Sequence, residues 1–428
     1  MEHITLLIGI VIITALVFDF TNGFHDTANA MATTISTGAM KPKAAVAMSA
    51  VLNLVGAFLS VEVAKTISGG IVDESGIRPE VIFAGLVGAI MWNLLTWLVG
   101  LPSSSSHALY GGLIGATLFS AGTGAIHADV VMTKVLLPAV AAPLVAGLAA
   151  LAATRLTYRL ARGRDERDTA KGYRSGQIAS AALVSLAHGT NDAQKTMGVM
   201  TLALITGGVL APDAGPPFWV IASAGIAIAL GTYLGGWRII RTMGKGLTDI
   251  SPPQGFSAQT GAATVILASS HLGFGLSTTQ VCSGAIMGSG LGRKGGVVRW
   301  STATRMFVAW GLTLPAAGLV GGLSALLAGQ GTWGVTAVAL AAIAASAWIW
   351  VRSRHEKVDH SNVNDVNSAD SGDGAGGAAT PADTGVLADA VLSVSPPPTE
   401  AALAASGEGI PAPRQESSRR PDQQPTTV

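Results

Sequence analysis

Charged residues are scarce in this chain. Asp, Glu, Lys and Arg make up 12% of its 428 residues, against roughly 25% in soluble domains. Hydrophobic residues make up 49%, and the mean hydropathy is +0.49. A soluble globule of this length would need far more surface charge to stay dispersed. The composition therefore excludes an ordinary soluble enzyme and predicts a protein that crosses a membrane several times.

Cysteine and excess charge of one sign are also lacking. The single cysteine, Cys282, excludes a disulfide framework and a cysteine-based metal cluster. The net charge of +1 gives no electrostatic basis for binding nucleic acid. The N-terminal apolar run lacks a basic start and a cleavage site, so we expect a retained first span rather than a removable signal peptide.

Long apolar runs are what the sequence has instead. Nine of them are close to the roughly 20 residues that cross a bilayer as a helix: 4–20, 44–64, 81–100, 131–153, 177–207, 218–236, 257–276, 300–327 and 332–351. Two shorter runs rich in Gly and Ser, 103–121 and 277–292, predict broken or re-entrant helices. The expected fold is an all-α polytopic membrane protein with eleven crossing elements.

The charges are concentrated in two places. Ten lie in residues 154–174, of which seven are Lys or Arg, and 17 lie in residues 352–428. The positive-inside bias places the central segment in the cytoplasm. The predicted topology therefore has the N-terminus outside and the C-terminus inside the plasma (inner) membrane. The predicted parts are a first transmembrane repeat (1–153), a basic cytoplasmic loop (154–175), a second repeat with one extra span (176–351), and a disordered cytoplasmic tail.

The sequence contains an internal repeat. Residues 22–31 (NGFHDTANAM) align without gaps to residues 188–197 (HGTNDAQKTM), and residues 100–115 align to residues 273–288. Five elements separate the two copies, so equivalent helices cross in opposite directions. This inverted topology is typical of secondary transporters, which hold substrate where the repeats meet. Chance similarity of Gly- and Ala-rich segments is the alternative, and two co-linear matches argue against it.

Ionisable residues fall inside or beside the apolar runs. A charge at that depth costs at least about 2.5–3.5 kcal/mol on insertion scales, which favours a functional role. Asn22, Asp26 and Asn29 share one helix face by their spacing. The matched segment repeats this face with three polar residues: His188, Asp192 and Lys195. The two faces together predict a polar cavity.

A structural role for these side chains stays open. Asp26 and Asp192 could cap broken helices, and Lys195 could be a buried partner of Asp192. The same alternative applies to three other polar residues in apolar surroundings: Asp19, His107 and His188.

Two hydroxyl-rich segments occupy matched positions before short helices: Ser104, Ser105 and Ser106 in the first copy, and Ser277, Thr278 and Thr279 in the second. Hydroxyls and free N–H groups at a helix N-terminus favour a small oxyanion. Carboxylates beside them would repel a bare anion, so a proton or metal cation is expected to enter with it. The pattern predicts cation-coupled symport, with helix packing by small residues as the alternative.

These motifs resemble a known family. NGFHDTANA, SLAHGTNDAQKTMG, PSSSSH and STTQ are similar to the signature regions of the inorganic phosphate transporter (PiT) family, over about residues 5–350. The resemblance implies two inverted repeats with phosphate bound near the midplane. We assign ten residues to substrate binding: Asn29, Ser104, Ser105, Ser106, Asn191, Gln194, Lys195, Ser277, Thr278 and Thr279. We assign three to cation or proton coupling: His25, Asp26 and Asp192.

Two positions depart from the family pattern. His25 replaces the first Asn of G-x-N-D-x-A-N, and Gln280 stands where His is common. The His variant resembles bacterial low-affinity members that use protons and carry phosphate as a neutral metal complex, and histidine titrates near neutral pH. The resemblance therefore implies a phosphate importer driven by protons, with sodium as the alternative coupling ion that the departure at His25 disfavours, and without a cofactor or enzymatic activity. Expected partners are phosphate, bilayer lipid and further copies of the chain.

Three alternatives remain. The family includes members that carry sulfate, so a permease for another oxyanion has the same fold. An intramembrane metal hydrolase would use four residues: His25, Asp26, His188 and Asp192. It would need three or more ligands on one metal, and no H-E-x-x-H spacing is present. A passive anion channel is disfavoured because carboxylates line the predicted path.

Overall fold

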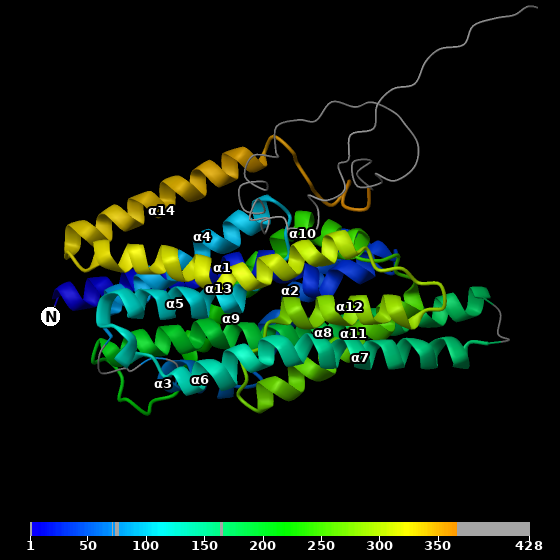
Figure 1. Ribbon diagram of the computed structural model, residues 1–428, viewed down its shortest axis with the longest axis horizontal. Coiled ribbons are helices and arrows are strands. Elements are labelled where there is room, and N and C mark those ends of the chain that lie inside the picture. Colours follow the sequence, from blue (N-terminus) through cyan, green and yellow to red (C-terminus); the bar gives the residue numbers. More distant parts are fainter. Residues whose placement is uncertain (1, 71, 73–76, 163–165, 366–428) are drawn as a thin grey trace, which may run out of the picture. The chain divides into compact units, whose positions relative to one another are not determined.

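The computed structural model describes residues 2–70, 72, 77–162 and 166–365. Within these ranges every regular element is helical, and the β-structure consists of two isolated bridges. Figure 1 shows the long helices side by side, with α14 (Thr332–Ser353) on the outside against α13 (Trp300–Ala328) and α4 (Pro79–Leu98). The all-α prediction is therefore confirmed.

The remaining elements follow in chain order. The first half holds α1 (Glu2–Ser36), α2 (Pro42–Gly56), α3 (Glu62–Gly70), α5 (Ser105–Ala121), η1 (Thr123–Ala125), α6 (Ala128–Val130), η2 (Val131–Leu136) and α7 (Leu137–Leu160). The second half holds α8 (Glu166–Thr206), α9 (Phe218–Leu234), α10 (Trp237–Arg241), η3 (Thr242–Gly246), α11 (Pro252–His271) and α12 (Thr278–Gly292).

Fewer helices than predicted pass as full membrane spans. In the described part of the chain, five are long and apolar enough, or six when the bent pair of α9 with α10 and η3 counts as one. The predicted run 44–64 divides into α2 and α3. The helices α5 and α12 have 17 and 15 residues, or about 25 and 22 Å, which is short of the roughly 30 Å hydrocarbon core. The predicted broken helices are thus short helices preceded by extended chain.

Helices also extend beyond the predicted runs. The run 4–20 continues as α1 to Ser36, and α8 carries the matched polar motif without interruption over 41 residues. Polar residues did not end these helices, because neighbouring helices supply their partners. The predicted loop 154–175 is largely helical, since α7 ends at Leu160 and α8 begins at Glu166. Residues 163–165 lie outside the described residues.

Helix packing follows the internal repeat. In the first half, α5 packs against α4 and α13, and in the second half α12 packs against α11 and α7. In the same way α1 packs against α9, and α8 packs against α2. These four helices thus each contact an element of the other half in matched order. The two halves interlock, and α1 and α8 cross at the centre.

Glycines at matched positions permit the closest of these crossings. A Cβ atom on Gly23 of α1 would collide with the carbonyl oxygen of Ile228 in α9. A Cβ atom on Gly189 of α8 would collide with the carbonyl oxygen of Asn53 in α2. Because glycine has no side chain, α1 and α8 each lie directly on the backbone of the neighbouring helix, and no larger residue fits at these positions. This contact fixes where the polar face that follows each glycine points.

The chain after α14 returns to the end of α1. Arg238 Nη2 donates to the Ser353 carbonyl at 2.8 Å, and Arg241 Nη2 donates to the Asn362 carbonyl at 2.9 Å. The Val363 side chain is buried. The first part of the predicted disordered tail, to residue 365, is therefore held against α10, and residues 366–428 lie outside the described residues.

Candidate functional site

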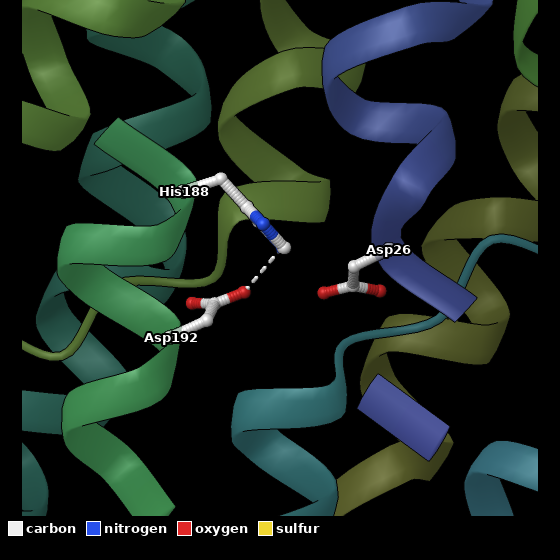
Figure 2. Close-up of side chains that lie close together, drawn as sticks. All are labelled: Asp26, His188 and Asp192. Atoms are coloured by element: carbon white, nitrogen blue, oxygen red, sulfur yellow. Dashed lines mark ion pairs between the residues drawn. The ribbon is translucent and has the colours of Figure 1, made fainter. Parts of the chain in front are cut away.

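Asp26 and Asp192 meet at the centre of the molecule. Figure 2 shows Asp26 on α1 directed toward His188 and Asp192 on α8. One ligand atom from each of these three side chains lies within 4.8 Å of the others, and all three are buried. The self-match predicted two facing polar stripes, and the crossing of α1 and α8 brings them together.

Neutral donors surround the Asp26 carboxylate. Ser105 Oγ donates to Asp26 Oδ2 at 2.7 Å, and Thr279 Oγ1 donates to Asp26 Oδ1 at 3.3 Å. Thr278 Oγ1 lies 3.4 Å from Asp26 Oδ2, between the two aspartates. His25 Nδ1 lies 2.6 Å from Asp26 Oδ1. The hydroxyl segments of both repeats therefore converge on one carboxylate.

A lysine and a histidine contact the Asp192 carboxylate. Lys195 Nζ forms an ion pair with Asp192 Oδ1 one helical turn away. His188 Nε2 lies 2.8 Å from Asp192 Oδ2, and Thr278 Oγ1 donates to the same oxygen at 3.0 Å. Lys195 is fully buried, and its ammonium also donates to the Leu276 carbonyl at 3.0 Å. A buried lysine is tolerated only with such partners.

The two hydroxyl segments begin their helices in the same way. The Ser104 side chain accepts a hydrogen bond from the His107 backbone N–H at 3.1 Å, and that of Ser277 accepts one from the Gln280 N–H at 3.3 Å. Both are N-caps. Across the two repeats, Gln280 Nε2 and His107 Nδ1 lie 3.3 Å apart. The N-terminal turns of α5 and α12 thus meet, and their positive dipole ends face the carboxylates.

Two further predicted residues connect this cluster. Asn29 Nδ2 donates to the hydroxyls of Thr278 and Thr279 at 3.2 and 3.1 Å. Ser106 Oγ donates to the Leu276 carbonyl at 3.1 Å, the oxygen that Lys195 also contacts.

Asn191 and Gln194 are directed toward other elements. Asn191 Nδ2 donates to Ser270 Oγ at 2.9 Å, at the end of α11. Gln194 Oε1 accepts from the backbone N–H groups of Val63 and Ala64 at 2.8 and 3.3 Å, at the start of α3. In this structure they hold helix ends against α8, and their assignment to substrate contact stays a prediction.

Two partners of His25 were not predicted. Its Nε2 lies 3.2 Å from Thr96 Oγ1 on α4 and 3.4 Å from Ser103 Oγ. These two hydroxyls are themselves 2.8 Å apart. Local sequence gives no signal for Thr96, because its contact depends on how α4 packs on α1. His188 was recognisable from its spacing four residues before Asp192.

The arrangement combines anion donors with cation ligands. Hydroxyls, an amide and an ammonium suit oxyanion oxygens, whereas two carboxylates and two imidazoles suit a proton or a divalent cation. Residues of the cluster are at most 6% exposed, so an ion that enters it exchanges water for protein ligands. A cavity of about 830 Å³ beside α5 and α13 is lined mostly by apolar groups and does not reach either aspartate.

Comparisons with known proteins identify the family of the chain. The model of the phosphate transporter family matches residues 22–171 and 157–321. A "probable low-affinity inorganic phosphate transporter" of Mycobacterium tuberculosis is 56% identical, over 84% of this chain and 87% of its own. One of Bacillus subtilis is 40% identical, over 76% and 98%.

The fold has a solved counterpart as well. A protein described as "the sodium-dependent phosphate transporter" superposes with a TM-score of 0.65, covering 76% of this chain and 99% of its own, at 22% identity. The relatives are transporters rather than enzymes, which agrees with the prediction of no enzymatic activity. The chain belongs to the phosphate transporter family.

Proposed function

We propose that this protein transports inorganic phosphate across the plasma membrane by symport, with the proton as the coupling ion. The relatives named above are phosphate transporters. The observation that carries the proposal is the convergence of Ser105, Thr278 and Thr279, from both repeats, on the paired carboxylates of α1 and α8.

Phosphate recognition would use groups that already donate to the carboxylates. The hydroxyls of Ser105, Thr278 and Thr279 are suited to phosphate oxygens, and the Lys195 ammonium supplies a positive charge. Phosphate and two ionised aspartates would repel one another strongly when they lie close together in a site without water. Protonation of the carboxylates or of His25 removes that repulsion, which ties phosphate entry to proton entry.

A divalent cation would serve the same purpose. Asp26, His188 and Asp192 offer three ligand atoms within 4.8 Å of one another. Oxygens of phosphate would complete the coordination, so metal and phosphate would travel together as a neutral complex. In this proposal the metal is cargo.

The direction of transport is proposed from the charge pattern. Arg155 and Arg159 lie in the last turns of α7 and Arg162 follows it, within the segment rich in Lys and Arg. With this end of the protein in the cytoplasm, the N-terminus lies outside. Phosphate then enters from the outer side of the membrane, where the proton concentration is higher.

Uptake of labelled phosphate into proteoliposomes tests the proposal. We expect accumulation under an inward proton gradient, enhancement by Mg²⁺, and a weaker response to sodium. Competition by arsenate but not sulfate is expected. Faster uptake of sulfate would overturn the substrate, and uptake indifferent to the proton gradient would overturn the coupling ion. Asp213→Asn, an exposed aspartate far along the chain from either motif, is the matched control for aspartate substitutions.

A further inference from the structure

A further buried acid lies on α1, N-terminal to the residues of the cluster described above. Asp19 precedes Asp26 by nearly two helical turns and has an exposed fraction of 0%. Neither of its carboxylate oxygens has a hydrogen-bond partner among the described residues. Its carboxylate faces the side chains of Asn22, one turn along α1, and Thr196 on α8.

Two neighbours of Asp19 are also buried without hydrogen-bond partners within the described ranges. Asn22 Oδ1 and Nδ2 and Thr196 Oγ1 are buried without hydrogen-bond partners in the part of the chain that the structure describes. An unpaired carboxylate in such surroundings costs several kcal/mol, on the order of the effective penalty for burying an ion. Two oxygen-bearing side chains left unpartnered around one unpartnered acid indicate that a positively charged group belongs among them.

The donor chemistry restricts what that group can be. A carboxylate, an amide oxygen and a hydroxyl are hard oxygen ligands, which disfavours transition metals that prefer nitrogen or sulfur. One carboxylate balances one positive charge. The charged side chains that act on Asp19 from the neighbouring helix are Asp192 and Lys195 of α8, which are paired with each other. The local balance therefore calls for one monovalent cation.

The second repeat has no equivalent of this acid. The position on α8 that matches Asp19 is Ser185, whose Oγ donates to Ser49 Oγ at 3.0 Å. The position that matches Asn22 is His188, which contacts Asp192. The Asp19 group thus breaks the symmetry of the repeat, unlike the duplicated aspartates of the central cluster.

We propose that Asp19, Asn22 and Thr196 form a separate binding site for one hard monovalent cation, a proton or Na⁺, that is coupled to transport. This inference rests on the proposed function for its coupling role and on the geometry alone for its cation. The site lies on the same two helices as the central cluster, so its occupancy acts on the α1–α8 contact.

Steady-state accumulation measures the coupling. Wild type and Asp19→Asn are compared in proteoliposomes under a tenfold inward gradient of protons or of sodium. Each coupled monovalent cation supports about tenfold accumulation under such a gradient. We expect Asp19→Asn to accumulate about tenfold less phosphate under the gradient of the cation that the site binds. Exchange of internal for external phosphate at equal concentrations should persist. Ser185→Ala, at the matched position, should accumulate phosphate as wild type does.

Cation binding itself is measured without transport. For Na⁺, the Tm of the purified protein should rise with sodium in wild type and stay constant in Asp19→Asn. For a proton, the infrared carbonyl band of a protonated carboxyl should be present in wild type and absent in Asp19→Asn. Loss of neither signal, or unchanged accumulation under both gradients, would overturn the site. Absence of phosphate accumulation in wild type, with the cation signals intact, would overturn only the proposed function.

Discussion

The two repeats hold their matched aspartates with different chemistry. Asp26 accepts hydrogen bonds from hydroxyls and contacts one histidine, whereas Asp192 is paired with Lys195 and His188. The position matched to Lys195 is Asn29, a neutral amide. The matched segments therefore lie in similar helix contacts, whereas their side chains differ in cation balance and hydrogen bonding.

The difference has an energetic meaning. A carboxylate paired with an internal ammonium needs no external ion to stay buried, although removal of one partner leaves the other uncompensated. A carboxylate held mainly by hydroxyl donors has no internal ammonium beside it and attracts a cation or proton. The first repeat is therefore the one suited to an exchangeable cation, and the second repeat supplies a fixed one.

The largest expected effect is at Lys195. Lys195→Met leaves Asp192 buried without its cation, so we expect loss of uptake and a destabilisation of about 3–5 kcal/mol, typical of a broken buried pair. Thermal unfolding in detergent measures the stability. The double variant Lys195→Met/Asp192→Asn should regain most of the Tm but no uptake. An unchanged Tm in the single variant would contradict the internal pair.

Asp192→Asn and Asp26→Asn test the two aspartates directly. Both should abolish gradient-driven uptake while expression remains, because each removes a carboxylate from the cluster. Asp192→Asn should also lower the Tm, since Lys195 then lacks its partner, whereas Asp26→Asn should leave it near the wild-type value. Uptake at wild-type levels in the Asp192 variant would return that residue to a structural role.

Gly23→Val and Gly189→Val test whether the backbone frame is duplicated. Each adds atoms where a backbone carbonyl of the partner helix already lies, and overpacking of this kind costs about 1–3 kcal/mol. We expect similar losses of Tm in both variants. Gly9→Val is the control, because nothing lies within 4 Å of a Cβ added at that position of α1. A loss in only one variant would show that the two crossings differ.

His25→Asn should reduce uptake and flatten its dependence on pH from about 5 to 8, the range in which histidine side chains in general can take up a proton. The reason is the contact between the His25 ring and the Asp26 carboxylate. The residue matched to His25 is Asn191, so Asn191→Ala should leave the pH profile in place. Uptake rates across that pH range measure both. An unaltered profile in His25→Asn would remove histidine from proton coupling.

The smallest effect is expected at the contact between the repeats. Gln280→Ala removes the contact between Gln280 Nε2 and His107 Nδ1. An ordinary hydrogen bond contributes about 0.5–1.5 kcal/mol to stability. A modest fall in Tm with uptake above half of wild type is expected. Complete loss of uptake would mean that the contact governs movement of α5 relative to α12.

Much of this arrangement could be predicted from the sequence. Apolar runs located the helices, and the self-match located Asp26, Asp192 and the hydroxyl segments. The ends of α1 and α8 could not be found in this way, because a polar stretch inside a helix resembles its end when the packing partners are unknown. Side-chain direction was equally hidden. Gln194 lies one residue before Lys195, and only the position of α3 decides that it turns away from the cluster.

The ion pair of Lys195 with Asp192 has a consequence for the unloaded carrier. The empty binding site of a symporter must return to face its starting side. An unpaired carboxylate in that site would oppose the change, because a charge is costly in surroundings of low dielectric constant. With its own ammonium bound, Asp192 travels as a neutral dipole. Under the proposed function, Lys195 allows the empty transporter to return to its starting conformation. Asp26, whose partners are mainly hydroxyls, makes phosphate binding depend on an ion from solution.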